Sequence, residues 1–218
     1  MKRKYEITDI QHPETPKLFR IRALRDIPRF NVKAGELGGY IQREGNLRQT
    51  CDCWVDSNAV ASGNVVVSGN AKVSGNAKVS GNAKVSGNAK VYDHAYVFGD
   101  ARIYDHAKVY GNCQIYESAS VSEEAQVFGN VQVFDTAWIA GNAVVQDNAK
   151  VFGDAFILGD CIIDKNMEIS EVCYINSSSQ IYYSDGVTIF LNIQGDFINN
   201  GSSPDIEYHK TLARVKLL

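Results

Sequence analysis

A single apolar residue recurs at every sixth position along most of the chain. Stepping by six from Val55 to Ile181 gives Val or Ile at every step except Ala61. An α-helix repeats about every 3.6 residues and does not produce this period, whereas a very short strand followed by a turn does. We number each six-residue word from this apolar residue. Position 1 is predicted to point inward and its two neighbours outward.

The other positions of the word predict a corner. Residues 67–90 read VSGNAKVSGNAKVSGNAKVSGNAK, which is one word written four times. Gly at position 3 tolerates positive φ, Asn follows it, and the small residue at position 5, usually Ala, fits inside the corner. Parallel strands stack at about 4.8 Å, and three words per turn form a triangular prism, the hexapeptide β-helix. The words are predicted to build about seven coils.

Both ends of the repeat break its period. Residues 1–50 are predicted to form an N-terminal β cap, residues 51–181 the solenoid and residues 182–218 a C-terminal cap. Such caps are expected because an open solenoid end exposes a row of unpaired backbone groups. In the first cap, KYEIT and KLFRIRALRDI alternate like strands around an HPETP turn.

The C-terminal cap is predicted to contain a hairpin and a short helix. The stretch IYYSDGVTIFLNIQ indicates a hairpin that turns at SDG. Ser203 and Pro204 suit the start of a helix. The face of this helix would carry Tyr208, Leu212 and Val215.

The segment that leads into the repeat resembles a known family. Its similar elements, which precede the Asn-Ala words, are Val32-Lys33-Ala34-Gly35, Gly38-Gly39-Tyr40-Ile41, Asn46-Leu47 and Cys53-Trp54-Val55. They resemble the YdcK-like β-solenoid proteins of bacteria and their phages, over residues 20–180. The resemblance implies an all-β, left-handed parallel β-helix of unassigned biochemistry. Cys51-Asp52-Cys53 departs from the Gly-containing form expected in that family.

The composition narrows the function classes. The net charge of −3 over 218 residues disfavours electrostatic binding to nucleic acid. No apolar run approaches the roughly 18 residues of a membrane span, so no membrane partner is expected. The start of the chain is basic but lacks the apolar core of a secretory signal, and the five cysteines suit a reducing compartment. We therefore expect a cytoplasmic location.

The residue types that carry catalysis or bind metals do not converge in the predicted fold. His94 and His106 both occupy position 4 but are 12 residues apart, which places them on different corners. Three further cysteines share position 5 on three different corners: Cys113, Cys161 and Cys173. Cys51 and Cys53 form a lone CxC, which is a weak metal or redox signal. We expect no metal, no cofactor and no catalytic residue.

Outward aromatic residues are the candidate binding surface. Residues 18 apart share a column, which predicts three ladders: Phe98, Tyr116, Phe134 and Phe152; Tyr92, Tyr110 and Phe128; and Trp138, Phe156 and Tyr174. Mutual stacking explains one ladder, but three are more apolar surface than a monomer is expected to expose. Lys72, Lys90 and Lys108 form a column beside the second ladder, where we favour a solvated face over a site for single-stranded nucleic acid. We predict self-association, as a trimer first and a dimer second.

The resulting interpretation is a non-enzymatic, self-associating β-solenoid that serves as a rigid platform for a macromolecular partner. Because the similar family occurs in bacteria and their phages, we extend this interpretation to a phage-encoded inhibitor that binds a host protein, including a defence protein. Two alternatives stay open. One is an acyltransferase with its site between subunits, using His94 or His106, although the words run without the loop insertion usual in such enzymes. The other binds a small ligand or nucleotide in clefts between subunits.

Overall fold

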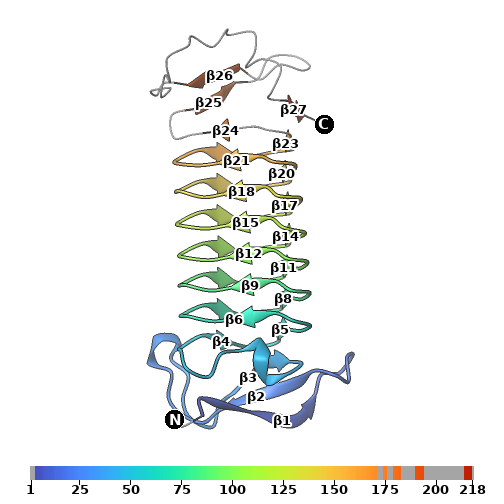
Figure 1. Cartoon of the computed structure of the whole chain (residues 1–218), viewed down its shortest axis with the longest axis vertical. Helices are drawn as coiled ribbons and strands as arrows, with labels where there is room; N and C mark the ends of the chain where they lie inside the picture. The colour runs from blue at the N-terminus through green and yellow to red at the C-terminus, as the bar shows by residue number, and fades with distance from the viewer. Residues whose placement is uncertain (1–2, 171–173, 176–178, 183–189, 194–213, 218) are drawn as a thin grey trace.

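The protein is a column of stacked coils with a β cap at its N-terminal end (Figure 1). This computed structural model describes residues 3–170, 174–175, 179–182, 190–193 and 214–217. Within these residues the only helices are two 3₁₀ turns, η1 (Pro28–Phe30) and η2 (Glu44–Asn46). The predicted all-β solenoid of about seven coils is therefore confirmed.

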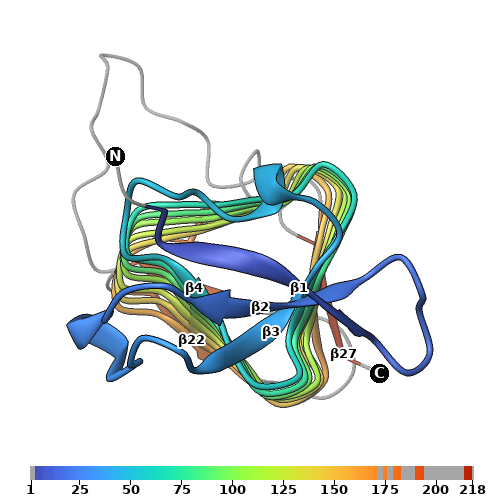
Figure 2. The same ribbon diagram turned by 90° about the horizontal axis from the view of Figure 1, so that it is seen from below.

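Three parallel sheets form the walls of the column, and Figure 2 shows their three-sided outline from below. We name each wall by its first strand. The β4 face contains β4 (Trp54–Val55), β7 (Lys72–Val73), β10 (Lys90–Val91), β13 (Lys108–Val109), β16 (Gln126–Val127), β19 (Val144–Val145) and β22 (Ile162–Ile163). The β5 face contains β5 (Val60–Ala61), β8 (Lys78–Val79), β11 (Tyr96–Val97), β14 (Gln114–Ile115), β17 (Gln132–Val133), β20 (Lys150–Val151) and β23 (Met167–Ser170). The β6 face contains β6 (Val66–Val67), β9 (Lys84–Val85), β12 (Arg102–Ile103), β15 (Ser120–Val121), β18 (Trp138–Ile139), β21 (Phe156–Ile157) and β24 (Tyr174–Ile175).

The register of the walls places each word directly beneath the word 18 residues later. Val91, for example, pairs with Val73 below it and Val109 above it. All three of these side chains are fully buried, as is the position 5 alanine Ala107. The inward register predicted from the period of six is correct, and the core is a stack of Val, Ile and Ala layers.

The corners use the left-handed backbone conformation at position 3, although this residue is often not glycine. Glu123 adopts φ 56° and Asp147 φ 63°. A left-handed residue with a side chain costs about 1–2 kcal/mol. At these corners the carboxylate accepts a hydrogen bond from the backbone N–H directly above it. Glu123 Oε2 lies 2.7 Å from Gly141 N, and Asp147 Oδ2 lies 3.0 Å from Lys165 N. This added bond offsets part of the conformational cost.

Position 4 adds a second set of bonds between coils, made by side-chain amides. Asn112 Nδ2 donates to Asn130 Oδ1 at 3.2 Å, and Asn130 Nδ2 donates to Asn148 Oδ1 at 2.9 Å. Such amide ladders are typical of strands that stack in register. The Gly-Asn pair of the word therefore supplies both the turn and a link to the next coil.

The N-terminal cap is an antiparallel meander that continues the β5 face. It consists of β1 (Tyr5–Gln11), β2 (Phe19–Ala23) and β3 (Leu37–Ile41), and β3 then pairs in parallel with β5. The strands expected on either side of the HPETP turn are confirmed. Gly38 and Gly39 are required in β3 because a Cβ atom would lie 2.6 Å from the Trp54 ring or 2.5 Å from the Ala59 carbonyl oxygen. This close approach lets the fully buried Trp54 cover the end of the core.

At the opposite end, the two strands of the predicted hairpin are paired, its SDG turn lies outside the described residues, and part of the predicted helix is wrong. β25 (Ser179–Tyr182) pairs antiparallel with β26 (Phe190–Ile193). Val215, predicted to lie on the face of this helix, instead lies in strand β27 (Arg214–Leu217), antiparallel to β23. β27 pairs with the outer edge of β23, whose backbone groups would otherwise lack partners. The predicted helix start and its other named residues lie outside the described residues: Ser203, Pro204, Tyr208 and Leu212.

Within the part of the chain that the structure describes, no helix has the length and apolar character needed to cross a membrane.

Candidate functional site: aromatic ladders and a thiol–lysine cluster

The longest aromatic ladder follows the β5 face, immediately before its corners. Its rings stack nearly parallel, with centroid distances of 4.9 Å from Phe98 to Tyr116, 5.0 Å from Tyr116 to Phe134 and 4.9 Å from Phe134 to Phe152. The interplanar angles are 3–6°. We call these four residues the Phe98 ladder. The structure brings together all four side chains that the period of 18 placed in this column.

A second ladder follows the β4 face and contains Tyr92, Tyr110 and Phe128. Its consecutive rings are stacked with centroids 4.8 Å apart. Each ring covers the faces of its neighbours, so these side chains are half-buried within a single chain. Burial raises the pKa of the Tyr92 and Tyr110 hydroxyls above their ordinary value. We call these three residues the Tyr92 ladder.

The third column, on the β6 face, packs differently from the other two. Trp138 and Phe156 meet edge to face at 5.9 Å and 62°. Trp138 Nε1 donates to the hydroxyl of the buried Ser122 at 2.8 Å, which turns the indole across the face. The backbone of Tyr174 pairs with Phe156 as expected, and its side chain lies outside the described residues. The β6 face therefore carries an aromatic contact between two coils.

The residues beside the ladders distinguish the β5 face from the β4 face. On the β5 face the neighbouring column contains Tyr96, Gln114 and Gln132, and the Tyr96 ring lies 4.5 Å from Phe98. Tyr96 is 38% exposed. On the β4 face the equivalent column contains Lys90 and Lys108. The column beside the Phe98 ladder is therefore uncharged over three coils, between Lys78 and Lys150, whereas Lys90 and Lys108 flank two of the three rungs of the Tyr92 ladder.

The histidines lie apart, as the spacing predicts. His94 follows β10 and His106 follows β12, so they occupy different corners, and both are exposed. His106 Nε2 lies 3.2 Å from Asn88 Nδ2, and its Nδ1 lies 3.6 Å from Glu124 Oε1. Among the described residues there is no group of three His, Cys, Asp or Glu side chains placed to hold a metal ion.

The cysteines of the repeat are core residues. Cys113 Sγ donates to the Tyr110 carbonyl at 3.1 Å, and Cys161 Sγ donates to the Leu158 carbonyl at 3.5 Å. Burial raises the pKa of Cys113 to about 12 and that of Cys161 to about 11. Burial therefore disfavours the thiolate, which is the nucleophilic form, at both positions. Cys173 lies outside the described residues.

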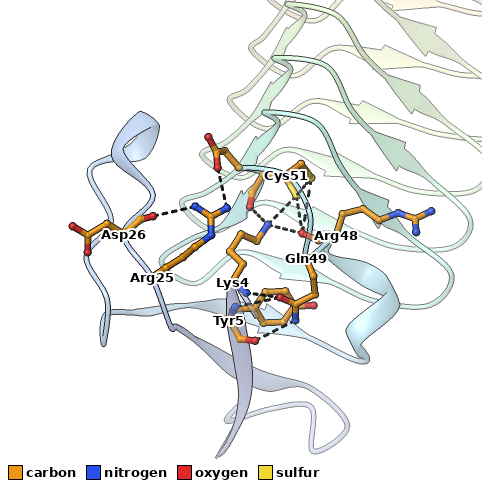
Figure 3. Close-up of polar contacts among 9 residues, drawn as sticks. Lys4, Tyr5, Arg25, Asp26, Arg48, Gln49 and Cys51 are labelled. Carbon is orange, nitrogen blue, oxygen red and sulfur yellow. Dashed lines mark hydrogen bonds and ion pairs between the residues drawn. The ribbon is translucent and has the colours of Figure 1, made fainter. Parts of the chain in front are cut away.

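A cluster that the sequence did not predict lies between the N-terminal cap and the first coil (Figure 3). Lys4 is fully buried, and its Nζ donates to the carbonyl oxygens of Arg48 at 2.5 Å and Cys53 at 2.7 Å. The same Nζ lies 3.3 Å from Cys53 Sγ, and Cys53 Sγ lies 3.2 Å from Cys51 Sγ. Lys4 was overlooked because its partners are 44–49 residues away and two of them are backbone atoms.

Neighbouring side chains hold this cluster in place. The Gln49 amide donates to the Tyr5 carbonyl at 3.1 Å, and its oxygen accepts from the Lys4 N–H at 2.8 Å. The Tyr5 hydroxyl donates to the carbonyl oxygens of Glu44 and Leu47, and burial raises the pKa of this phenol. Asp52 forms an ion pair with Arg25 at 3.1 Å. The turn that carries the two cysteines is therefore fixed from both sides.

The comparisons with known proteins agree with the fold. The three walls and the repeated corners define a parallel β-solenoid built from hexapeptide words. Residues 101–117 match the family model described as YdcK Beta solenoid repeat, and this match together with the coils supports a YdcK-like solenoid. Among curated proteins, none matches the chain.

Proposed function

We propose that this protein is a non-enzymatic, self-associating platform whose contact surface is the β5 face. The observation that carries the proposal is the Phe98 ladder, in which four rings repeat at 4.9–5.0 Å on a rigid wall. A second copy of the chain repeats at the same spacing, so the β5 face of one copy can meet a wall of the next copy coil by coil. A partner without this period would match only one or two rungs.

The side chains around the Phe98 ladder support a contact surface on this wall. Protein interfaces combine an apolar centre, poor in charge and rich in aromatic residues, with a polar rim. The centre here contains Tyr96, Gln114 and Gln132 beside the ladder. The corner next to the ladder is polar and includes Asp100, Glu117, Asp135 and Asp154. The basic column on the β4 face makes the Tyr92 ladder the weaker candidate, because buried unpaired charges are costly.

The same surface defines the expected assembly and its role. Prisms that pack side by side around a three-fold axis give a trimer, and pairing about a two-fold axis gives a dimer. We favour the trimer. The assembled column would then present its remaining faces to a macromolecular partner in the cytoplasm, including a host protein if the chain is encoded by a phage. No arrangement of the described residues favours the acyltransferase or the ligand-cleft alternative over this one.

Light scattering after size exclusion tests the proposal. We expect the wild-type protein to have a mass that is a multiple of 24.0 kDa. Tyr116→Ala with Phe134→Ala should shift the mass toward the monomer, because it removes the two central rungs of the Phe98 ladder. The matched control is Tyr92→Ala with Tyr110→Ala, which removes two stacked rings from the β4 face and should leave the mass unchanged.

Two results would contradict this assignment. A wild-type monomer at every concentration would exclude self-association, and the β5 face would then have to bind a different protein. An equal loss of mass in both double variants would show that the effect is a general weakening of the walls. Circular dichroism on each variant distinguishes that weakening from a lost interface.

A further inference from the structure

The thiol–lysine cluster combines two adjacent sulfur atoms, a difference in solvent exposure between them, and a buried lysine. A purely structural turn needs none of these three features. Two sulfur atoms, Cys51 Sγ and Cys53 Sγ, lie 3.2 Å apart, whereas a disulfide bond is about 2.05 Å long. Cys51 is half-buried and Cys53 is fully buried. One thiol can therefore be reached from solvent and the other is held directly behind it.

Lys4 adds a buried positive charge to this pair. Its three N–H groups match three acceptors, namely the Arg48 carbonyl, the Cys53 carbonyl and Cys53 Sγ. Among the described residues no carboxylate lies within ion-pairing distance of Lys4. A buried charge is normally paired. The sulfur of Cys53 is the only one of its three acceptors that can become an anion.

We propose that Cys51 and Cys53 form a redox-active dithiol that exchanges with small-molecule disulfides, with Lys4 positioned to stabilise negative charge on Cys53. This site is independent of the surface proposed for self-association. The chemical class of its partner is an aliphatic disulfide of the glutathione type.

The exchange proceeds in two balanced steps. Cys51 first loses its proton to solvent. The Cys51 thiolate attacks one sulfur of the disulfide, the sulfur–sulfur bond breaks, and the leaving thiolate takes up a proton from solvent. Cys53 then attacks Cys51 Sγ, and the second thiol leaves with the proton that Cys53 loses. The sum converts two protein thiols and one disulfide into one protein disulfide and two small thiols.

The geometry assigns the order of the two cysteines. Cys51 is the attacking group because small molecules can reach it, and attack requires access as well as a thiolate. Burial raises the pKa of Cys53 to about 12, while the nearby Lys4 charge acts in the opposite direction. Cys53 thus remains a thiol until the mixed disulfide forms beside it. Lys4 Nζ, 3.3 Å away, then stabilises the charge that develops on the attacking sulfur.

The test uses the reduced full-length protein and glutathione disulfide at neutral pH. Samples are quenched with acid, alkylated after denaturation and mapped by peptide mass, so that each cysteine is followed separately. We expect Cys51 and Cys53 to lose alkylation together, with the loss of two hydrogens and no retained glutathione. Cys113 and Cys161 should remain alkylated, because the fold shields them from the disulfide.

Three variants separate the two steps. Cys53→Ser should accumulate a glutathione adduct on Cys51. Cys51→Ser should react with glutathione disulfide at least about tenfold more slowly than wild type, because the remaining thiol is buried. Lys4→Met should retain the first step and slow the second about tenfold, so that the adduct accumulates. Lys90→Met, which alters an exposed lysine of the repeat, is the matched control and should behave as wild type.

Oxidation of Cys113 in any variant would report unfolding and distinguish it from a specific effect of Lys4. The proposal is overturned if Cys51 and Cys53 of the wild type are still fully alkylated after incubation with glutathione disulfide. It is also overturned if Cys51 keeps glutathione without closing onto Cys53. The same closure rate in folded Lys4→Met and wild type would remove Lys4 from the mechanism.

Discussion

The solenoid and its N-terminal cap are stabilised in different ways. In the solenoid the buried residues are nearly all Val, Ile and Ala, with Ser122 as a polar exception, and the amide ladders lie at exposed corners. In the cap, Lys4 and Asn46 are buried polar side chains, and each has its own set of partners. Asn46 is fully buried, accepts from the Gln42 and Arg43 N–H groups, and donates to the Gly63 and Val65 carbonyls.

The difference follows from what each region has to pair with. A coil inside the column meets a copy of itself above and below, so one word satisfies its backbone groups at every level. The first coil has no such neighbour on its outer side. Its backbone groups need side chains placed individually, and Asn46 and Lys4 provide them. We therefore expect substitutions at most repeat corners to lower the free energy of unfolding slightly. Substitution of each buried polar residue of the cap should lower it much more.

Val109→Asp should have the largest effect, because it places an unpaired charge in the apolar core of the column. We expect a loss of at least about 4 kcal/mol in the free energy of unfolding, or failure to fold. Lys108→Asp, at the outward neighbour on the same strand, should change stability by less than about 0.5 kcal/mol. Urea unfolding measures both. Similar losses would mean that the inside and outside of the β4 face are wrongly assigned.

Asn46→Ala should have the next largest effect, because it leaves the Gly63 and Val65 carbonyls in the cap without donors. The expected loss is about 2–3 kcal/mol in the free energy of unfolding. Asn130→Ala changes the same residue type in an exposed corner ladder and should cost about 0.5 kcal/mol. Equal values from thermal or urea unfolding would remove the contrast between cap and repeat.

Changes at Glu123 should have the smallest effect and test the corners alone. Glu123→Ala loses the bond to the Gly141 N–H and keeps the left-handed cost, so we expect a loss of about 1 kcal/mol. Glu123→Gly also loses the bond but removes the cost of about 1 kcal/mol, and it should match wild type closely. If the alanine and glycine variants have the same melting temperature, backbone strain does not contribute at these corners.

The repeat could be predicted in detail because its contacts are local and periodic. A period of six fixes which residues point inward, and a period of 18 fixes which residues share a column. Both follow from the backbone alone. The Phe98 and Tyr92 ladders were therefore predictable residue by residue, whereas the edge-to-face contact of Trp138 was not. That contact depends on a hydrogen bond to Ser122, which column spacing does not report.

The sequence was less informative where contacts span long separations. Lys4 lies in a basic stretch that resembles a solvated surface, and its burial depends on carbonyl groups that any residue possesses. The CxC spacing of Cys51 and Cys53 can be read from the sequence, but the redox role proposed for them depends on their contact with Lys4. Val215 fitted a helical face, yet the open edge of β23 provides a pairing site that local propensity does not include.

The four identical words at residues 67–90 also make the column adjustable in length. A gain or loss of three words adds or removes one whole coil and leaves each wall aligned. A gain or loss of one word instead turns everything beyond it by a third of a revolution about the long axis. Because the ladders begin at Tyr92, they would turn as one body relative to the cap. Insertion or deletion of one word within this stretch would therefore rotate the aromatic ladders relative to the cap and preserve every type of contact that stabilises the column.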